Sequence, residues 1–212
     1  FALIKLNDKQ ELYKLFLIGL LEYSLYAYIS YRFLSYFNEL FLLYVFNMSL
    51  SLYLLIRSIG LLKMDVIQGY YQKPLPIKRT FAFLIVVALM LTLMWLARII
   101  PGLSPSEQPV GLETYHTLVI QAMDLGLIVP LSLISAYYLL KRKAIGYALT
   151  AVVLFKGVAL FAAVSTMAIV QGFMDRNVNY IEMVIFIVLT LIALYITVLF
   201  FNRSMKPAKK AV

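Results

Sequence analysis

The stretch QAMDLGLIVP (121–130) places a carboxylate, Asp124, inside an apolar run that extends over about 114–140. A second run, at about 144–171, carries Lys156 in VVLFKGVALF. Both runs exceed the ~20 residues that a helix needs to cross the ~30 Å hydrocarbon core of a bilayer. The two segments therefore predict membrane-spanning helices that each hold one charged side chain within the apolar layer.

The composition supports a membrane protein. Of the 212 residues, 63% are hydrophobic and 14% are charged, whereas soluble domains carry about 45–50% apolar and about 25% charged residues. The chain contains no cysteine and one histidine, which excludes disulfides, thiolate metal sites and a multi-histidine metal site within one chain. We expect no metal and no cofactor.

Six apolar runs are long enough to span a bilayer as helices. The sequence therefore predicts an all-α, polytopic transmembrane helical bundle that forms a single domain over residues 1–212. The opening residues FALI (1–4) have the character of a helix end, so a seventh helix in a longer chain is the alternative. The six expected helices cover about 12–31, 39–57, 80–98, 114–140, 144–171 and 181–201.

The connections between these runs are short, apart from the loop at 57–79. This loop begins with an amphipathic pattern and ends with Pro74 and Pro76, which predicts a short interfacial helix followed by extended chain. Three prolines at 101–111 indicate a stiff surface loop on the other side of the bundle.

Basic residues predict the orientation, because short cytoplasmic loops carry an excess of Lys and Arg. With six alternating helices, 15 of the 19 Lys and Arg fall on one side: in the N-terminal stub, the 57–79 loop, the 141–143 turn and the 202–212 tail. We therefore expect a multi-pass membrane protein with both termini of this chain, and thus its C-terminus, in the cytoplasm. The net charge of +9 then reflects membrane orientation, and the expected partner is the lipid bilayer rather than nucleic acid.

The two intramembrane charges are expected to meet. Asp124 lies ten residues, ~15 Å, into its predicted helix, and Lys156 lies twelve residues, ~18 Å, into the next one from the opposite face. The three-residue turn at 141–143 makes these helices antiparallel neighbours. The sequence thus predicts an Asp124–Lys156 ion pair near the middle of the bilayer.

Other polar residues reach the same predicted depth. Glu22 and Asn47 belong to this layer, with Tyr23 and Tyr26 close by. Charged groups at the bilayer centre cost ~2.5–3.5 kcal/mol each on insertion scales, so they face the bundle interior and usually pair. Two carboxylates and one ammonium leave one negative charge, which a proton or a cation would neutralise.

The 114–140 helix also carries a polar stripe along its length. A kink at Pro130 is expected, because proline cannot donate to the Gly126 carbonyl, and transporters build midplane sites from such broken helices. The stripe consists of Glu113, Thr117, Gln121, Asp124, Ser132 and Ser135.

Glu113, His116 and Arg98 form a second candidate group at the outer face. A lone histidine at this position is most simply a surface group, although its titration range also suits a pH sensor. Arg98, beside Trp95, is expected to reach the headgroups, as arginine does near helix ends.

The segments VIQAMDLGLIVP (119–130) and KRKAIGYALTAVVLFKG (141–157) resemble parts of uncharacterised bacterial polytopic inner-membrane proteins. The resemblance covers about 45 residues, roughly 115–160. It implies a bacterial inner-membrane protein and carries no activity and no functional residues.

Three classes of function remain open. The first is a protein that binds or transports a small solute, ion or proton through Asp124, Lys156, Glu22, Asn47, Gln121 and Tyr26. The second is a sensor or an assembly subunit, as a homo-oligomer or with a partner membrane subunit, in which the ion pair only fixes helix packing. The third is a membrane-embedded, lipid-modifying enzyme at the outer face, for which the sequence offers no nucleophile–base spacing.

Overall fold

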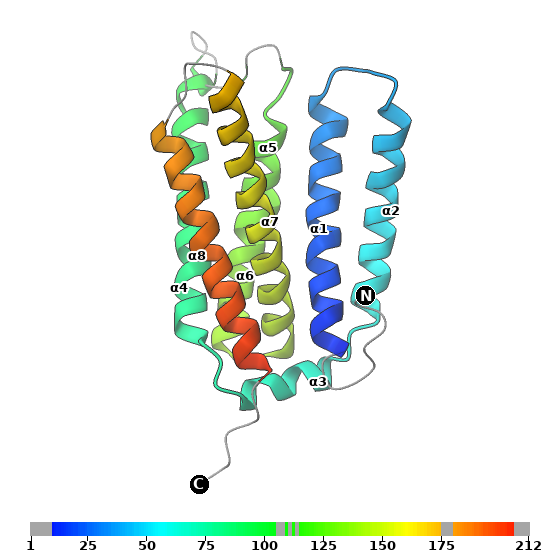
Figure 1. Ribbon diagram of the computed structural model, residues 1–212, viewed down its shortest axis with the longest axis vertical. Coiled ribbons are helices and arrows are strands. Elements are labelled where there is room, and N and C mark those ends of the chain that lie inside the picture. Colours follow the sequence, from blue (N-terminus) through cyan, green and yellow to red (C-terminus); the bar gives the residue numbers. More distant parts are fainter. Residues whose placement is uncertain (1–9, 105–108, 110–111, 113–114, 175–179, 206–212) are drawn as a thin grey trace.

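The computed structural model describes residues 10–104, 109, 112, 115–174 and 180–205 of the chain. Its described residues form an all-α bundle in which six helices are long and apolar enough to cross a membrane. The membrane-length helices lie side by side, and the short helix α3 lies across the lower end of the bundle, as seen in Figure 1. The prediction of an all-α, multi-pass helical bundle is confirmed.

The helices agree with the six apolar runs in number and in most boundaries. In chain order they are α1 Gln10–Leu34, α2 Phe41–Gly60, α3 Met64–Gly69, the 3-10 turn η1 Tyr70–Gln72, α4 Ile77–Ile99, the 3-10 turn η2 Pro101–Leu103, α5 Val119–Met123, the π-helical turn η3 Asp124–Ile128, α6 Val129–Leu140, α7 Ala144–Met174 and α8 Tyr180–Ser204. The initial FALI residues lie outside the described residues.

The fourth membrane-length helix begins later than expected. The chain is not helical over 115–118, and α5 starts at Val119 rather than near residue 114. His116 and Thr117 lie in a bend before it. Thr117 is therefore not part of a polar stripe on this helix, and Glu113 lies outside the described residues.

The bundle has two unequal parts. Helices α4, α6, α7 and α8 pack together, whereas α2 packs chiefly on α1, which in turn packs on α7. Figure 1 shows α1 and α2 as a hairpin beside the other four helices. On α2 only Ser51 is buried, so its outward faces expose large apolar side chains, as expected for a helix that faces lipid.

The loop after α2 contains the short helix that the sequence predicted, and it satisfies carbonyl groups at the ends of longer helices. Gln68 donates to the Arg142 carbonyl at 2.9 Å, and the Tyr71 hydroxyl donates to the Lys143 carbonyl at 3.0 Å. Lys73 donates to the carbonyl of Ser204, the last residue of α8. These contacts tie the segment to the turn between α6 and α7 and to the end of α8, so it closes the lower end of the bundle.

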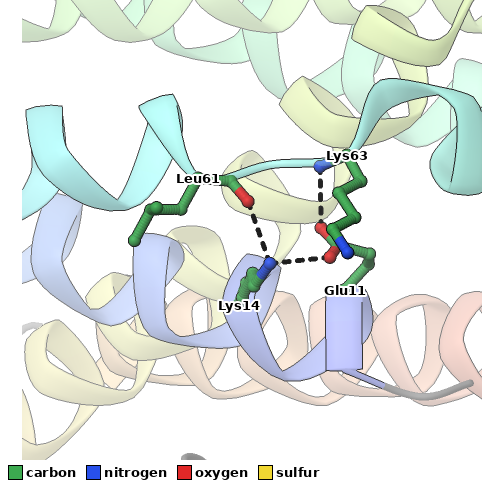
Figure 2. Close-up of polar contacts among 4 residues, drawn as sticks. All are labelled: Glu11, Lys14, Leu61 and Lys63. Atoms are coloured by element: carbon green, nitrogen blue, oxygen red, sulfur yellow. Dashed lines mark hydrogen bonds and ion pairs between the residues drawn. The ribbon is translucent and has the colours of Figure 1, made fainter. Parts of the chain in front are cut away.

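A small polar cluster ties the start of α1 to the same segment (Figure 2). Glu11 is 3% exposed and accepts from the Lys14 ammonium at 2.7 Å and from the Lys63 backbone N–H at 3.0 Å. Lys14 also donates to the carbonyl of Leu61, which caps α2, at 2.9 Å. The Glu11 carboxylate and the Lys14 ammonium together therefore join the start of α1 to the end of α2 and to the start of α3.

The closest approach between α6 and α7 occurs at Gly146. A β-carbon added there would lie 2.2 Å from the Tyr138 carbonyl carbon and 2.5 Å from the Leu139 nitrogen. These are backbone atoms, so they cannot move aside as a flexible side chain would. The absence of a side chain at Gly146 is what allows the tight turn at 141–143 to bring the two helices together.

We expect Gly146→Ala to lower the free energy of unfolding by about 1–3 kcal/mol, as overpacking does in a close-packed interior. Thermal unfolding of the purified protein in detergent measures the effect. Gly60→Ala is the matched control, because nothing lies within 4 Å of its added β-carbon. Equal melting temperatures for the two variants would show that the α6–α7 contact is looser than the structure has it.

Candidate functional site

The most deeply buried ammonium in the described part of the chain belongs to Lys156, on α7. Its side chain is 2% exposed, and its Nζ lies 3.2 Å from Oε1 of Glu22 on α1. The Glu22 side chain is 18% exposed. The two helices meet closely here, since a β-carbon added to Gly19 would lie 2.6 Å from Cβ of Phe155. The ion pair thus lies about one helical turn along α1 from this close α1–α7 contact.

Tyr26 lies one turn after Glu22 on α1 and contacts both Asp124 and Lys156. Its hydroxyl donates to Oδ1 of Asp124 at 2.9 Å, and the Lys156 Nζ lies 3.9 Å from the centroid of its ring. An ammonium over an aromatic face is attracted by the ring quadrupole. Tyr26 therefore stabilises the lysine with its face and the aspartate with its hydroxyl.

Asp124 is the first residue of the π-helical turn and is 3% exposed. Its second oxygen, Oδ2, accepts from Nε1 of Trp95 on α4 at 2.9 Å. Both carboxylate oxygens thus have a neutral donor from a neighbouring helix. The Arg98 guanidinium lies 5.4 Å from the Trp95 ring centroid, so an aromatic side chain separates Asp124 from the cation near the end of α4.

The expected Asp124–Lys156 ion pair does not form, because the lysine pairs with Glu22 instead. The two helices share the 141–143 turn: Asp124 lies about 24 Å before the end of α6, and Lys156 lies about 18 Å after the start of α7. Asp124 is therefore about one turn farther from the shared turn than Lys156, and Tyr26 bridges this offset.

The prediction that Asn47 joins this charged layer is wrong. Its Nδ2 donates to the Leu43 carbonyl of its own helix at 2.8 Å, and α2 packs chiefly on α1 rather than on the helices that carry Asp124 and Lys156. Gln121 is half-buried and lies close to one turn before Asp124. The structure thus brings together four of the predicted residues: Glu22, Tyr26, Asp124 and Lys156.

The outer-face group is not assembled by the described residues. His116 is exposed in the bend before α5, Arg98 stacks near Trp95, and Glu113 lies outside the described part of the chain. Within that part, no group of three or more His, Cys, Asp or Glu side chains is placed to hold a metal ion. The charged cluster of Glu22, Tyr26, Trp95, Asp124 and Lys156 is therefore the candidate site, and we call it the buried charge cluster.

The π-helical turn changes the backbone beside Asp124. The Val129 N–H bonds the carbonyl of Asp124, five residues earlier. Pro130 has no N–H, so neither Val129 nor Pro130 donates to the carbonyl of Leu125. The irregularity expected at Pro130 thus takes the form of a π turn, a feature that is frequent at functional sites.

Sequence reasoning missed Trp95 as a member of the cluster and named it only as a neighbour of Arg98. A usable signal was present, because this is the single tryptophan of the chain and a buried indole N–H needs an acceptor. The role of Gly19 was also missed, since a glycine within an apolar helix gives no indication of which helix approaches it.

Comparison of the chain with protein-family models, with curated proteins and with solved structures found no match. The interpretation of the buried charge cluster therefore depends on its geometry and its charges.

We expect Glu22→Gln and Lys156→Met each to destabilise the protein, by up to about 3–5 kcal/mol, because each leaves a buried charge without its partner. The double variant Glu22→Gln/Lys156→Met removes both charges and should recover much of that loss. Thermal unfolding in detergent measures all three variants. Glu39→Gln and Lys78→Met, at exposed positions, are the controls, and additive losses in the double variant would contradict the pairing.

Proposed function

We propose that this protein binds and releases one proton at the buried charge cluster and couples that exchange to the transport of a small solute or ion across a membrane. The observation that supports this proposal is the presence of two carboxylates and one ammonium among apolar helices, connected through Tyr26. The site consists of side chains from α1, α4, η3 and α7, so a change in its charge acts on four elements at once.

The charge balance favours uptake of a cation. With all three groups ionised, the cluster carries a net charge of −1, and an uncompensated charge within the hydrocarbon layer is costly. Ionisable groups in an apolar environment commonly neutralise instead of remaining charged. A proton is the smallest cation that restores neutrality, and it requires no coordination shell.

Glu22 is the better candidate for proton exchange. Its Oε2 is buried without a hydrogen-bond partner, while its side chain as a whole keeps some exposure at 18%. Asp124 has a donor on each oxygen and is 3% exposed. We infer that Asp124 remains the fixed anion and that Glu22 changes its protonation state.

Protonation of Glu22 would release Lys156 from its ion pair. The other carboxylate of the cluster is Asp124, which lies at the hydroxyl edge of the Tyr26 ring over which the ammonium sits. A lysine side chain is long and flexible, so it can move along this ring toward Asp124. This movement is the step that we propose couples proton binding to a change in helix packing.

A second candidate function is an assembly subunit or sensor in which the same ion pair only fixes α1 against α7. The position of the pair favours it, because the pair joins the α1–α2 hairpin to the rest of the bundle beside the close contact at Gly19. In this case the Glu22→Gln/Lys156→Met variant would keep its full function.

Direct proton binding tests the main proposal without knowledge of the transported solute. Purified wild-type protein should bind about one more proton on acidification than Glu22→Gln, because the variant lacks the titrating group. A pH-indicator dye in weakly buffered detergent solution measures the difference. Glu39→Gln, on the exposed α1–α2 connection, controls for the loss of an ordinary surface carboxyl. Identical proton uptake by wild type and Glu22→Gln, with Glu39→Gln showing the ordinary loss, would refute the proposal.

We also propose that the protein belongs to a bacterial inner membrane and that its C-terminus faces the cytoplasm. The basic residues at 57–79, 141–143 and 202–212 support this orientation. A C-terminal fusion to a reporter that is active only in the cytoplasm should therefore be active, and a fusion within the 101–111 loop should be inactive. An inactive C-terminal fusion together with an active fusion in the loop would show that the orientation is the reverse of the one we propose.

A further inference from the structure

The turn between α6 and α7 ends α6 with a Schellman motif, in which the residue after the helix cap has a left-handed backbone. The Arg142 N–H donates to the Leu139 carbonyl at 3.1 Å. The Lys143 N–H donates to the Tyr138 carbonyl at the same distance. Arg142 has a φ of 51°, the one positive φ of a non-glycine residue in the described part of the chain. This backbone is unfavourable for a residue with a β-carbon, so glycine, and less often asparagine, is usual at this position.

The packing of the turn does not account for an arginine at this position. The contacts of the turn with the segment after α2 use backbone carbonyls, since Gln68 donates to Arg142 and Tyr71 donates to Lys143. The Arg142 side chain is exposed, and its guanidinium forms no ion pair or hydrogen bond among the described residues. Glycine would therefore fulfil the same local role without the backbone cost. An unfavourable backbone that the fold does not require is a reason to look for a ligand of the side chain.

The turn lies where the apolar spans end. The span that contains α6 stops at Leu140, and the next one begins at Ala144, so three exposed cations at 141–143 lie between them. Tyr137, in the last turn of α6, is 56% exposed, and the Lys141 ammonium lies 5.8 Å from the centroid of its ring. Tyrosine and basic residues together at the end of an apolar helix are typical of the boundary between hydrocarbon and headgroups.

We propose that the Arg142 guanidinium, with Lys141 and Lys143 beside it, binds the phosphate of an anionic phospholipid in the leaflet at this end of the bundle. A guanidinium remains charged and presents planar N–H donors that match two oxygens of a phosphate. Adjacent cations at a membrane surface attract anionic lipids. Because both helices hold the turn at the depth of the headgroups, a lipid is the nearest source of phosphate. The inference does not rest on the proposed function, since it concerns a different part of the molecule.

Thermal unfolding in a neutral detergent with added lipid tests the proposal. Phosphatidylglycerol should raise the melting temperature of the wild type by about 2–4 °C more than phosphatidylcholine does, the shift typical of one interaction in a chain of this size. Arg142→Gly should lose most of this difference, whereas Arg142→Lys, which keeps the charge, should retain part of it. Arg57→Gln should keep the difference. It is the matched control because it removes an exposed arginine from the last turn of α2, at the same end of the bundle.

The same variants give the outcomes that would overturn the proposal. In detergent without lipid, Arg142→Gly should melt at or above the wild-type temperature, because glycine adopts a positive φ without steric cost. A lower melting temperature would show that the arginine stabilises the fold itself. An equal lipid difference in wild type and Arg142→Gly would show that the lipid does not bind there.

Inorganic phosphate distinguishes a lipid headgroup from a free anion. Phosphate ions alone should leave the wild-type melting temperature nearly unchanged. If they raise it as much as phosphatidylglycerol does, the turn binds free anions and the assignment to lipid fails. None of these outcomes depends on proton uptake, so the proposed function is tested separately.

Discussion

The structure depends on the compensation of one positive charge, the Lys156 ammonium, in a core that offers almost no water. At 2% exposure the charge cannot be solvated, and the long apolar helix around it provides no counter-charge. The Glu22 carboxylate from α1 supplies the counter-charge. This requirement places α1 against α7, and Gly19 permits the approach because any side chain there would collide with Phe155. Since α2 packs chiefly on α1, the position of the hairpin follows from this single pair.

One lysine is sufficient beside two carboxylates because neutral hydrogen-bond donors stabilise Asp124. The Tyr26 hydroxyl and the Trp95 indole each donate to one of its oxygens. Hydrogen bonds to an ionised acceptor are stronger than those between neutral groups, so Asp124 needs no direct ion pair. The Lys156 ammonium is therefore available to form an ion pair with Glu22. Tyr26 connects the Glu22–Lys156 pair with Asp124, since its ring faces the ammonium while its hydroxyl donates to the Asp124 carboxylate.

The sequence predicts the membrane-length helices well, because the length of an apolar run is a local property that the bilayer thickness constrains directly. It does not predict which charges pair. Pairing depends on depth, and Asp124 lies about one turn farther from the 141–143 turn than Lys156 does. It depends as well on which helices are neighbours, and nothing in the apolar pattern indicates that α1 lies beside α7. Asn47 was misplaced for this second reason, since its helix contacts chiefly α1.

The geometry of the cluster favours the proposed exchange of a proton over the binding of a larger cation. A metal ion needs several oxygen ligands arranged around it, but both oxygens of Asp124 are already occupied by donors that would have to leave. Glu22 offers one unpartnered oxygen, which suits a single proton and is too little for a coordination shell. Under the proposed function, the excess negative charge and the unused acceptor therefore coincide on Glu22, and Lys156 beside it is the group whose position would respond when Glu22 takes up a proton.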